Sequence, residues 1–223
     1  MELNADFAKR VSVHAAQIDW IASPMPGVDR RMLDRIGDEV ARATSIVRYA
    51  PGSSFSAHTH TGGEEFLVLE GVFTDEHGDY PVGTYVRNPM GTSHTPSSVP
   101  GTTIFVKLWQ FDESDQHQFS VDTEHAEYAE VSPGVSALLL HEDPREKVTM
   151  ERWAAGAAVT LDAPDGLEAL VIKGSFADAG EAFAPQSWLR LPRRGAATVN
   201  AGPEGAQVWI KRGHLAVPPT TPR

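Results

Sequence analysis

The chain has 223 residues, of which 41% are hydrophobic and 22% are charged, the balance of an ordinary globular protein rather than a disordered one. Cysteine is absent, which excludes disulfides, thiolate nucleophiles and cysteine-ligated metal centres. The formal charge of −11 would repel a phosphate backbone, so we expect no direct nucleic-acid binding. No apolar run is long enough for a membrane span or a secretory signal, which predicts no membrane partner and a cytoplasmic location.

Short apolar runs with a period of two follow one another along the chain, separated by Gly, Pro and Asp. The stretch up to about residue 38 is ambiguous, and we predict strand in its central part. The later runs are SIVRYA from Ser45, EFLVLEGVF from Glu65, TYVRN from Thr84, TTIFVKLWQF from Thr102, VSALLL from Val135, VTMERW from Val148, EALVIKG from Glu168, SWLRL from Ser187 and QVWIK from Gln207. Runs spaced in this way are typical of an all-β sandwich or barrel.

Several segments of the first half recur in the second half. VRYAPGSS recurs as ERWAAGAA, EEFLVLEGVF as LEALVIKGSF, and FVKL as WIKR, with matched positions 103–104 residues apart. A unit of about one hundred residues used twice predicts two similar domains in tandem. We predict a first barrel over residues 1–112, a linker over 113–130, a second barrel over 131–216 and a tail over 217–223.

Potential metal ligands gather in the first copy, in the segments GSSFSAHTHTGGEEFLVLEG and GTYVRNPMGTSH. His58 and His60 are two residues apart, so on a strand both imidazoles point to the same face. The Thr-Gly-Gly turn that follows allows a sharp reversal that brings Glu64 toward them, and His94 follows a Pro-x-Gly turn further on. Three imidazoles and one carboxylate suit Fe(II), Mn(II), Ni(II), Zn(II) or Cu(II).

These two segments resemble the two motifs of the cupin superfamily, Gx5HxHx3-4Ex6G and Gx5PxGx2Hx3N. Nine of the ten fixed positions are present, and Ser98 stands where the family has Asn. Over about residues 13–111 the closer resemblance is to the cupin domain of ChrR-type anti-sigma factors and of related iron dioxygenases that cleave small diketones. The resemblance implies a bicupin, that is, two tandem cupin jelly-roll β-barrels.

The resemblance also implies that His58, His60, Glu64 and His94 bind one divalent metal ion per chain, as the ChrR cupin binds zinc through three His and one Glu. We expect zinc or Fe(II) first, with Mn or Ni as further possibilities. Glu65 is the alternative to Glu64 as the carboxylate ligand. Adjacent residues on a strand face opposite ways, so only one of the two can reach the ion. We favour Glu64, since it keeps the family's six-residue gap to Gly71, and assign Glu65 a supporting or structural role.

The second copy lacks this constellation. Alignment of the repeats places Asp162 opposite His58, Pro164 near His60, and Glu168 opposite Glu65 rather than Glu64. No imidazole stands opposite His94. We therefore predict no metal in the second barrel and expect Trp153, Trp188 and Trp209 to fill its interior.

Two functions remain open. One is a regulatory or stress-sensing role in transcription of the ChrR type, with a sigma factor as a possible partner, although the Cys-containing domain through which ChrR binds its sigma factor has no counterpart in this cysteine-free chain. The alternative is a mononuclear non-haem iron dioxygenase acting on a small diketone or related carbonyl compound.

Both functions place a small-molecule ligand or substrate in the first barrel. We expect its walls to include Phe66, Tyr85, Arg87 and Met90, which flank the two motifs. No residue stands out as a catalytic acid or base and no organic cofactor is indicated. Either a monomer or a homodimer is compatible with two barrels in one chain.

Overall fold

The computed structural model describes residues 1–38 and 40–217. The chain divides into two compact units. Among the described residues, the first contains Met1–Ala5 and Asp19–His125, and the second contains Asp6–Ile18 and residues 126–217. Of the predicted tail over 217–223, all but the first residue lies outside the described residues. Among these described residues, no helix is long and apolar enough to cross a membrane.

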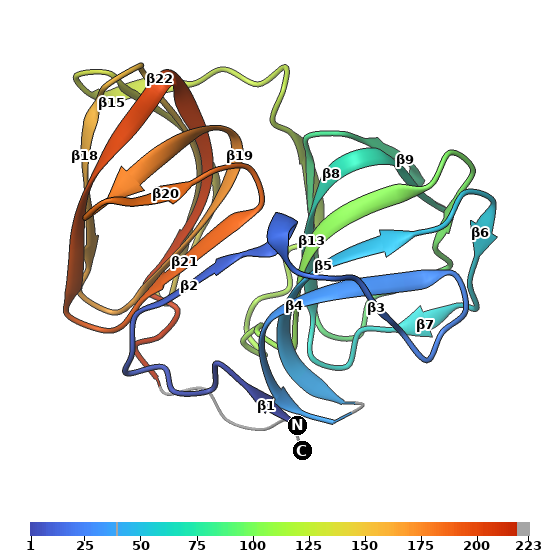
Figure 1. Cartoon of the computed structure of the whole chain (residues 1–223). Coiled ribbons are helices and arrows are strands. Elements are labelled where there is room, and N and C mark those ends of the chain that lie inside the picture. Colours follow the sequence, from blue (N-terminus) through green and yellow to red (C-terminus); the bar gives the residue numbers. More distant parts are fainter. Residues whose placement is uncertain (39, 218–223) are drawn as a thin grey trace. The chain divides into compact units, whose positions relative to one another are not determined.

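The first unit is an antiparallel β-structure. One path of paired strands runs β1-β4-β5-β13-β8-β10-β14, with β3, β9, β12 and β6 attached to it, and β7 pairs with β11 (Figure 1). The strands are β1 (Glu2–Leu3), β3 (Ile21–Ala22), β4 (Val28–Gly37), β5 (Ala41–Tyr49), β6 (Ser53–Ser54), β7 (His58–Thr59), β8 (Glu64–Asp75), β9 (Gly78–Pro81), β10 (Thr84–Asn88), β11 (Ser93–His94), β12 (Ser97–Ser98), β13 (Thr102–Leu108) and β14 (Phe119–Asp122).

The second unit repeats this plan with the path β15-β16-β17-β22-β19-β21-β2, while β18 pairs with β22 and β20 with β19. Its elements are β2 (Val11–His14), the short 3-10 turn η1 (Ala15–Gln17), β15 (Ala129–Ser132), β16 (Val135–Glu142), β17 (Lys147–Trp153), β18 (Ala158–Ala163), β19 (Leu167–Asp178), β20 (Glu181–Phe183), β21 (Ser187–Leu191) and β22 (Gly195–Arg212). The predicted all-β fold of two barrels is confirmed.

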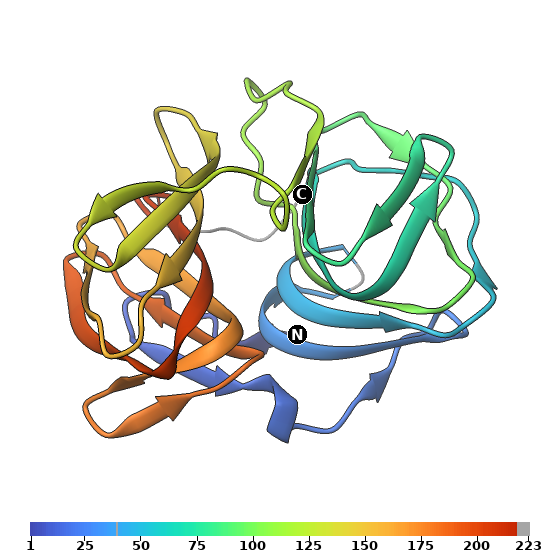
Figure 2. The same cartoon turned by 90° about the horizontal axis from the view of Figure 1, so that it is seen from above.

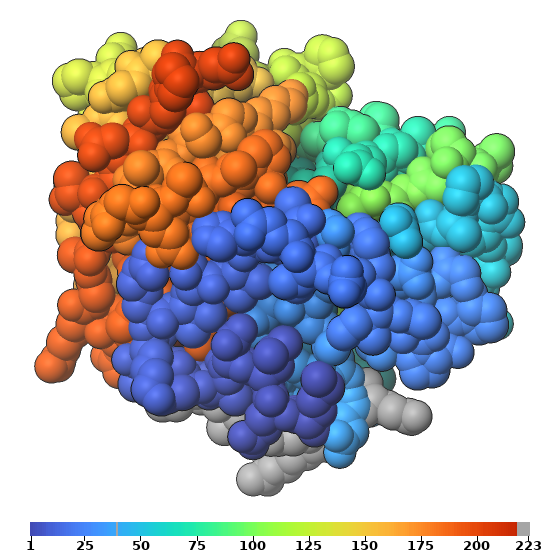
Figure 3. All heavy atoms as spheres, in the orientation of Figure 1, coloured from blue at the N-terminus to red at the C-terminus, as the bar shows by residue number. Residues whose placement is uncertain are grey.

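One strand near the start of each sequence repeat pairs in the sheet formed by the other repeat. Strand β2 pairs with β21 in the second unit, and the equivalent β14 pairs with β10 in the first. Figure 1 shows β2 beside β21, and in Figures 2 and 3 the blue chain of this segment lies against orange chain of the same unit. This division differs from the predicted ranges, because residues 6–18 lie with the second unit and β14 lies within the predicted linker.

The glycine that ends the EEFLVLEG segment has a structural reason to recur. Gly71 has φ +71, and a Cβ there would lie 1.9 Å from the carbonyl oxygen of Gly101. Gly174 has φ +67, and its Cβ would lie 2.1 Å from the oxygen of Gly205. The long strands β8 and β19 therefore pass their neighbours at a point where only glycine fits.

The two barrels differ in their apolar cores. The larger cluster lies in the second unit and includes Trp153, Leu161, Phe176, Phe183 and Val199. The first unit has a smaller cluster made of Phe66, Val68, Phe73, Val86, Ile104 and Val106.

The expectation that three tryptophans fill the second interior holds for Trp153. Trp188 and Trp209 are fully buried but do not belong to that cluster. Trp188 lies on the same side of its sheet as Glu168, to which its indole N–H donates a hydrogen bond.

Candidate metal centre

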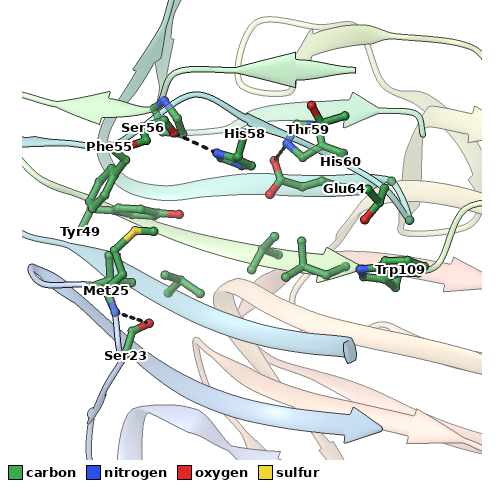
Figure 4. Close-up of a pocket in the computed structure, with 18 of the residues that line it drawn as sticks. Ser23, Met25, Tyr49, Phe55, Ser56, His58, Thr59, His60, Glu64 and Trp109 are labelled. Atoms are coloured by element: carbon green, nitrogen blue, oxygen red, sulfur yellow. Dashed lines mark hydrogen bonds and ion pairs between the residues drawn. The ribbon is translucent and has the colours of Figure 1, made fainter. Parts of the chain in front are cut away.

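Three strands of the first unit, with the segment that follows the first of them, bring His58, His60, Glu64 and His94 together. His58 lies in β7 directly opposite His94 in β11, His60 follows β7, and Glu64 begins β8. One nitrogen of each histidine and one carboxylate oxygen all lie within 4.8 Å of one another. Figure 4 shows the side chains of His58, His60 and Glu64 at the cavity that they line.

The turn between His60 and Glu64 requires its two glycines. Gly63 has φ +75, which favours glycine. A Cβ on Gly62 would lie 2.1 Å from the ring of Trp109, and one on Gly63 would lie 2.4 Å from the ring of Phe111. The two aromatic side chains thus pack directly on the turn and hold Glu64 next to the histidines.

The distances within the cluster suit a shared ion. The Nε2 atoms of His60 and His94 are 3.2 Å apart, and Oε1 of Glu64 lies 3.4 Å from the first and 3.8 Å from the second. Two nitrogens bound to one metal ion at about 2.1 Å each lie roughly 3 Å apart. The cluster therefore has the dimensions of a coordination shell.

Hydrogen bonds to the opposite ring nitrogens fix the tautomers. The Thr92 hydroxyl donates to the carbonyl oxygen of Pro89 at 2.7 Å, so it accepts from Nδ1–H of His60 at 2.9 Å. Nδ1–H of His94 donates to the Asp75 carboxylate at 3.2 Å. In both rings Nε2 therefore carries a lone pair directed into the cluster, an arrangement typical of metal-binding histidines.

Burial shifts the pKa values of the cluster. Burial and the neighbouring histidines lower the pKa of His60 to about 3, and burial followed by the charge of His58 lowers the pKa of His94. Burial raises the pKa of Glu64 to about 7, which the charge of Asp75 reinforces and a hydrogen bond from Asn88 opposes. The two buried imidazoles are thus neutral at pH 7, the form that binds metals.

The two facing lone pairs show that the residues fit a metal ion. Neutral Nε2 atoms of His60 and His94 at 3.2 Å are both acceptors and cannot satisfy each other. A cation between them would satisfy both nitrogens and would also favour the ionised form of Glu64.

Glu65 points away from this cluster. Its carboxylate accepts hydrogen bonds from the Tyr85 hydroxyl at 2.5 Å and from Arg87 at 3.0 Å. Glu65 and Arg87 are both buried, so the pair forms an internal ion pair on the other face of the sheet. The structure thus places Glu64, and not Glu65, next to the histidines.

His58, His60 and Glu64 of the cluster lie in the wall of a cavity of about 410 Å³. Apolar side chains from β4, β5 and β13 form much of its lining, including Val28, Val47, Val106 and Leu108. Figure 4 shows Tyr49, Phe55 and Met25 on one side of the histidines and Trp109 at the other end. The volume is within the range of small-ligand sites.

The wall predicted from the sequence is wrong in detail. None of Phe66, Tyr85, Arg87 and Met90 lines this cavity. Phe66 belongs to the apolar cluster of the first unit, and Tyr85 and Arg87 bind Glu65 on the opposite face. Sequence reasoning missed Arg30, Tyr49 and Trp109, because these residues come from β4, β5 and the segment after β13, which lie outside the two motifs.

The described residues of the second unit form no comparable cluster by themselves. Asp162 is exposed and pairs in register with Ala196, where the first unit pairs His58 with His94.

Comparison with known proteins relates this fold and this cluster to one family. Residues 8–112 match the family described as the ChrR cupin-like domain. Over these residues the chain is a cupin. No curated protein sequence matches it significantly.

Solved structures similar to this chain share its fold at low sequence identity. A candidate dioxygenase from Nostoc punctiforme is 13% identical with a TM-score of 0.78, over 96% of this chain and 86% of that chain. A cupin 2 conserved barrel domain protein from Leptotrichia buccalis is 13% identical with a TM-score of 0.62, over 91% and 96%. A variant of oxalate decarboxylase from Bacillus subtilis is 13% identical with a TM-score of 0.63, over 91% and 76%.

Proposed function

We propose that the first barrel binds one divalent metal ion through His58, His60, Glu64 and His94, and that the cupin is a mononuclear metal-dependent oxygenase acting on a small carbonyl compound. The observation that carries this proposal is that three of the four side chains, His58, His60 and Glu64, line a largely apolar cavity of about 410 Å³, and that His94 completes the cluster beside them. A metal held there would have a ligand-sized space beside it.

The donor set supports a metal of intermediate hardness. Imidazole nitrogen and carboxylate oxygen suit Fe(II), Zn(II), Mn(II) and Ni(II), and the Bacillus subtilis oxalate decarboxylase, which has this fold, contains Mn(II) centres. For the oxygenase we favour Fe(II), since zinc has no accessible redox change.

When bound, the metal would polarise a carbonyl oxygen of the substrate and, as Fe(II), would supply the electrons needed to engage dioxygen. The residues of the chain contribute orientation and exclusion of water. Thr92 and Asp75 hold the imidazoles of His60 and His94 in the ligating tautomer, and the apolar walls keep bulk water from the bound substrate. For a β-diketone, addition of one dioxygen molecule with cleavage of one C–C bond gives a carboxylic acid and a dicarbonyl product, and both oxygen atoms appear in the products.

The family match favours a second candidate function. Residues 8–112 match the ChrR cupin-like domain, so a ligand-responsive regulator of transcription would use the same metal and the same cavity. In that case the bound ligand would alter the affinity for a protein partner such as a sigma factor, and no turnover would occur.

Metal analysis of protein purified without an affinity tag tests the site itself. We expect one metal ion per chain in the native protein and almost none in His94→Ala. His77→Ala is the matched control, because His77 is exposed in the β8–β9 turn and lies outside the cluster. Two ions per chain, or full occupancy in His94→Ala, would contradict the proposed site.

An oxygen electrode separates the two functions. The iron-loaded protein should consume dioxygen only when a short diketone or hydroxyketone is added, and the zinc-loaded protein should consume none. Absence of consumption across such compounds, together with zinc in the protein as isolated, would support the regulator instead.

A further inference from the structure

Arg30 brings a positive charge to the wall of the metal cavity. It lies in β4 opposite Val47 of β5, and Val28, two residues earlier on the same face, lines the cavity with it. Their neighbours face the other way: Asp29 pairs with Arg48 at 2.7 Å, and the Arg31 guanidinium lies 4.2 Å from the ring centre of Trp20. Strand alternation thus directs Arg30, but not Arg31, to the cavity.

Arg30 has no compensating group in the part of the chain that the structure describes. Its Nε is buried without a hydrogen-bond partner, and none of the ion pairs among described residues includes Arg30, in contrast to Arg10, Arg42, Arg48 and Arg87. A partly buried guanidinium left without an acceptor is costly. An anionic group of a ligand in the cavity would satisfy it.

The charge balance of the cavity also favours an anion. Among the described residues that line it, Glu64 is the only carboxylate, and its carboxylate faces the histidines. A divalent ion at the cluster together with Arg30 would outweigh the charge of Glu64. The cavity would therefore attract an anion although the whole chain carries −11.

We propose that the ligand of this cavity is a small, mainly apolar carboxylate that also carries carbonyl oxygens, and that Arg30 binds its carboxylate while the carbonyl end reaches the metal cluster. This inference rests on the proposed function, because it assumes a metal at His58, His60, Glu64 and His94. It makes Arg30 a specificity-determining residue, since a guanidinium matches the geometry of a carboxylate in a two-point contact. The apolar lining between the two polar ends accommodates the hydrocarbon part of the ligand.

Calorimetric titration of the zinc-loaded protein tests this inference without turnover. The probes are 4,6-dioxoheptanoate and heptane-2,4-dione, which share a β-diketone and differ in the terminal carboxylate. We expect the acid to bind about tenfold more tightly, as one charge-assisted contact allows. Arg30→Met should abolish this preference, and Arg30→Lys should retain part of it. Arg31→Met removes the same charge from the outer face and should keep the full preference.

The outcomes distinguish the two proposals. Equal affinity for both probes in the native protein, or an unchanged preference in Arg30→Met, would overturn the role of Arg30 while leaving the metal site intact. Failure of the native protein to bind zinc would instead contradict the proposed function, and this inference with it. Thermal melting of each variant shows whether it is folded, and the Arg30→Lys variant keeps the test decisive if Arg30→Met is unstable.

Discussion

The two barrels share one strand plan. They keep the same charged pair on one face of the sheet and differ on the other face. On one face Glu65 stands opposite Arg87, and at the same register of the second barrel Glu168 stands opposite Arg190. All four side chains are buried. A charged pair that recurs in both repeats, with and without a metal cluster nearby, belongs to the architecture of the barrel.

The other face differs. In the first barrel Glu64 stands opposite Asn88, and in the second Leu167 stands opposite Leu191. The second barrel thus places an apolar pair where the first places a candidate ligand and its hydrogen-bond partner. The large apolar cluster of the second unit shows what the same scaffold contains when the polar cluster is absent. The comparison teaches that one face of this sheet can hold either a packed core or a polar site, while the buried Glu–Arg pairs on the opposite face remain.

Removing Glu65 or Glu168, the buried carboxylates at the same register of the two barrels, should have the largest effect on the free energy of unfolding. Glu65→Ala removes one of the two carboxylates that pair with the buried Arg87, the other being Asp115, and Glu168→Ala removes the carboxylate that binds the Trp188 N–H and His214. Loss of one member of a buried ionic network costs about 3–5 kcal/mol. We expect both variants to lose free energy of unfolding of this order in denaturant titrations. Asp162→Ala, at an exposed position, should change it by less than about 0.5 kcal/mol. A large loss of free energy of unfolding in only one of the two variants would refute a shared architectural role for these carboxylates.

Metal removal should distinguish the barrels next. A ligand that binds only the folded state stabilises it by about 4 kcal/mol at a thousandfold excess over its dissociation constant. We expect chelation to reduce hydrogen-exchange protection in β7, β8 and β11 and to leave β18 and β19 unchanged. Glu64→Leu, which copies the second barrel, should show no response to chelator. An equal loss of protection in β18 and β19 would break the comparison.

The sequence predicted most of the fold because its evidence is local. The period-two runs mark most of the strands, and the repeat marks the two barrels. The exchange of β2 and β14 was not predictable, because the four residues of VSVH and of FSVD carry too short a pattern to indicate a distant edge strand as their partner. Pairing partners far apart in sequence depend on the completed sheet.

The same distinction applies to the candidate site. The clustering of His58, His60, Glu64 and His94 follows from motif spacing and strand alternation, which act over a few residues. The part of the cavity wall outside the motifs comes from β4, β5, β13 and the segment after β13, so the spacing of the motif residues gives no signal for it. One signal was present in the sequence: Arg30 is a charged residue two positions after the apolar Val28, and residues two apart on a strand share one face. Asn88 faces Glu64, so its neighbour Arg87 had to face away from the cavity.

The pH dependence of the metal-free protein sharpens the comparison at Glu64. Burial raises the pKa of Glu64 to about 7 from its ordinary 4.5, so the folded state holds this proton more tightly than the unfolded state. This contribution to stability is fully present below about pH 4.5 and is lost as the pH rises through 7. His60 acts in the opposite direction, because its pKa is lowered to about 3 and stability is lost as the pH falls below about 6.5.

Glu64→Gln isolates the carboxyl contribution, because it leaves His60 and Asp75 in place. The stability of the native metal-free protein relative to this variant should fall by about 3 kcal/mol between pH 4.5 and 7.5. Urea titrations across this range measure it. In the metal-loaded protein the trend should reverse, since the ion requires ionised Glu64 and neutral imidazoles. A difference that does not change with pH would show that Glu64 is not held in an apolar environment.

The smallest effect should come from a carboxylate that both barrels contain. Asp75 ends β8 and accepts the Nδ1–H of His94, whereas Asp178 ends β19 and pairs with Arg10. Asp75→Asn removes the charge that orients and polarises the His94 ring, and loss of such a partner weakens metal binding by about 10- to 100-fold. Asp178→Asn makes the same chemical change where no imidazole is present, so metal affinity should stay as in the native protein. Competition with a chromophoric chelator measures both affinities. Equal weakening in the two variants would mean that lost negative charge acts over the whole chain, whereas weakening in Asp75→Asn alone would assign the effect to the hydrogen bond with His94.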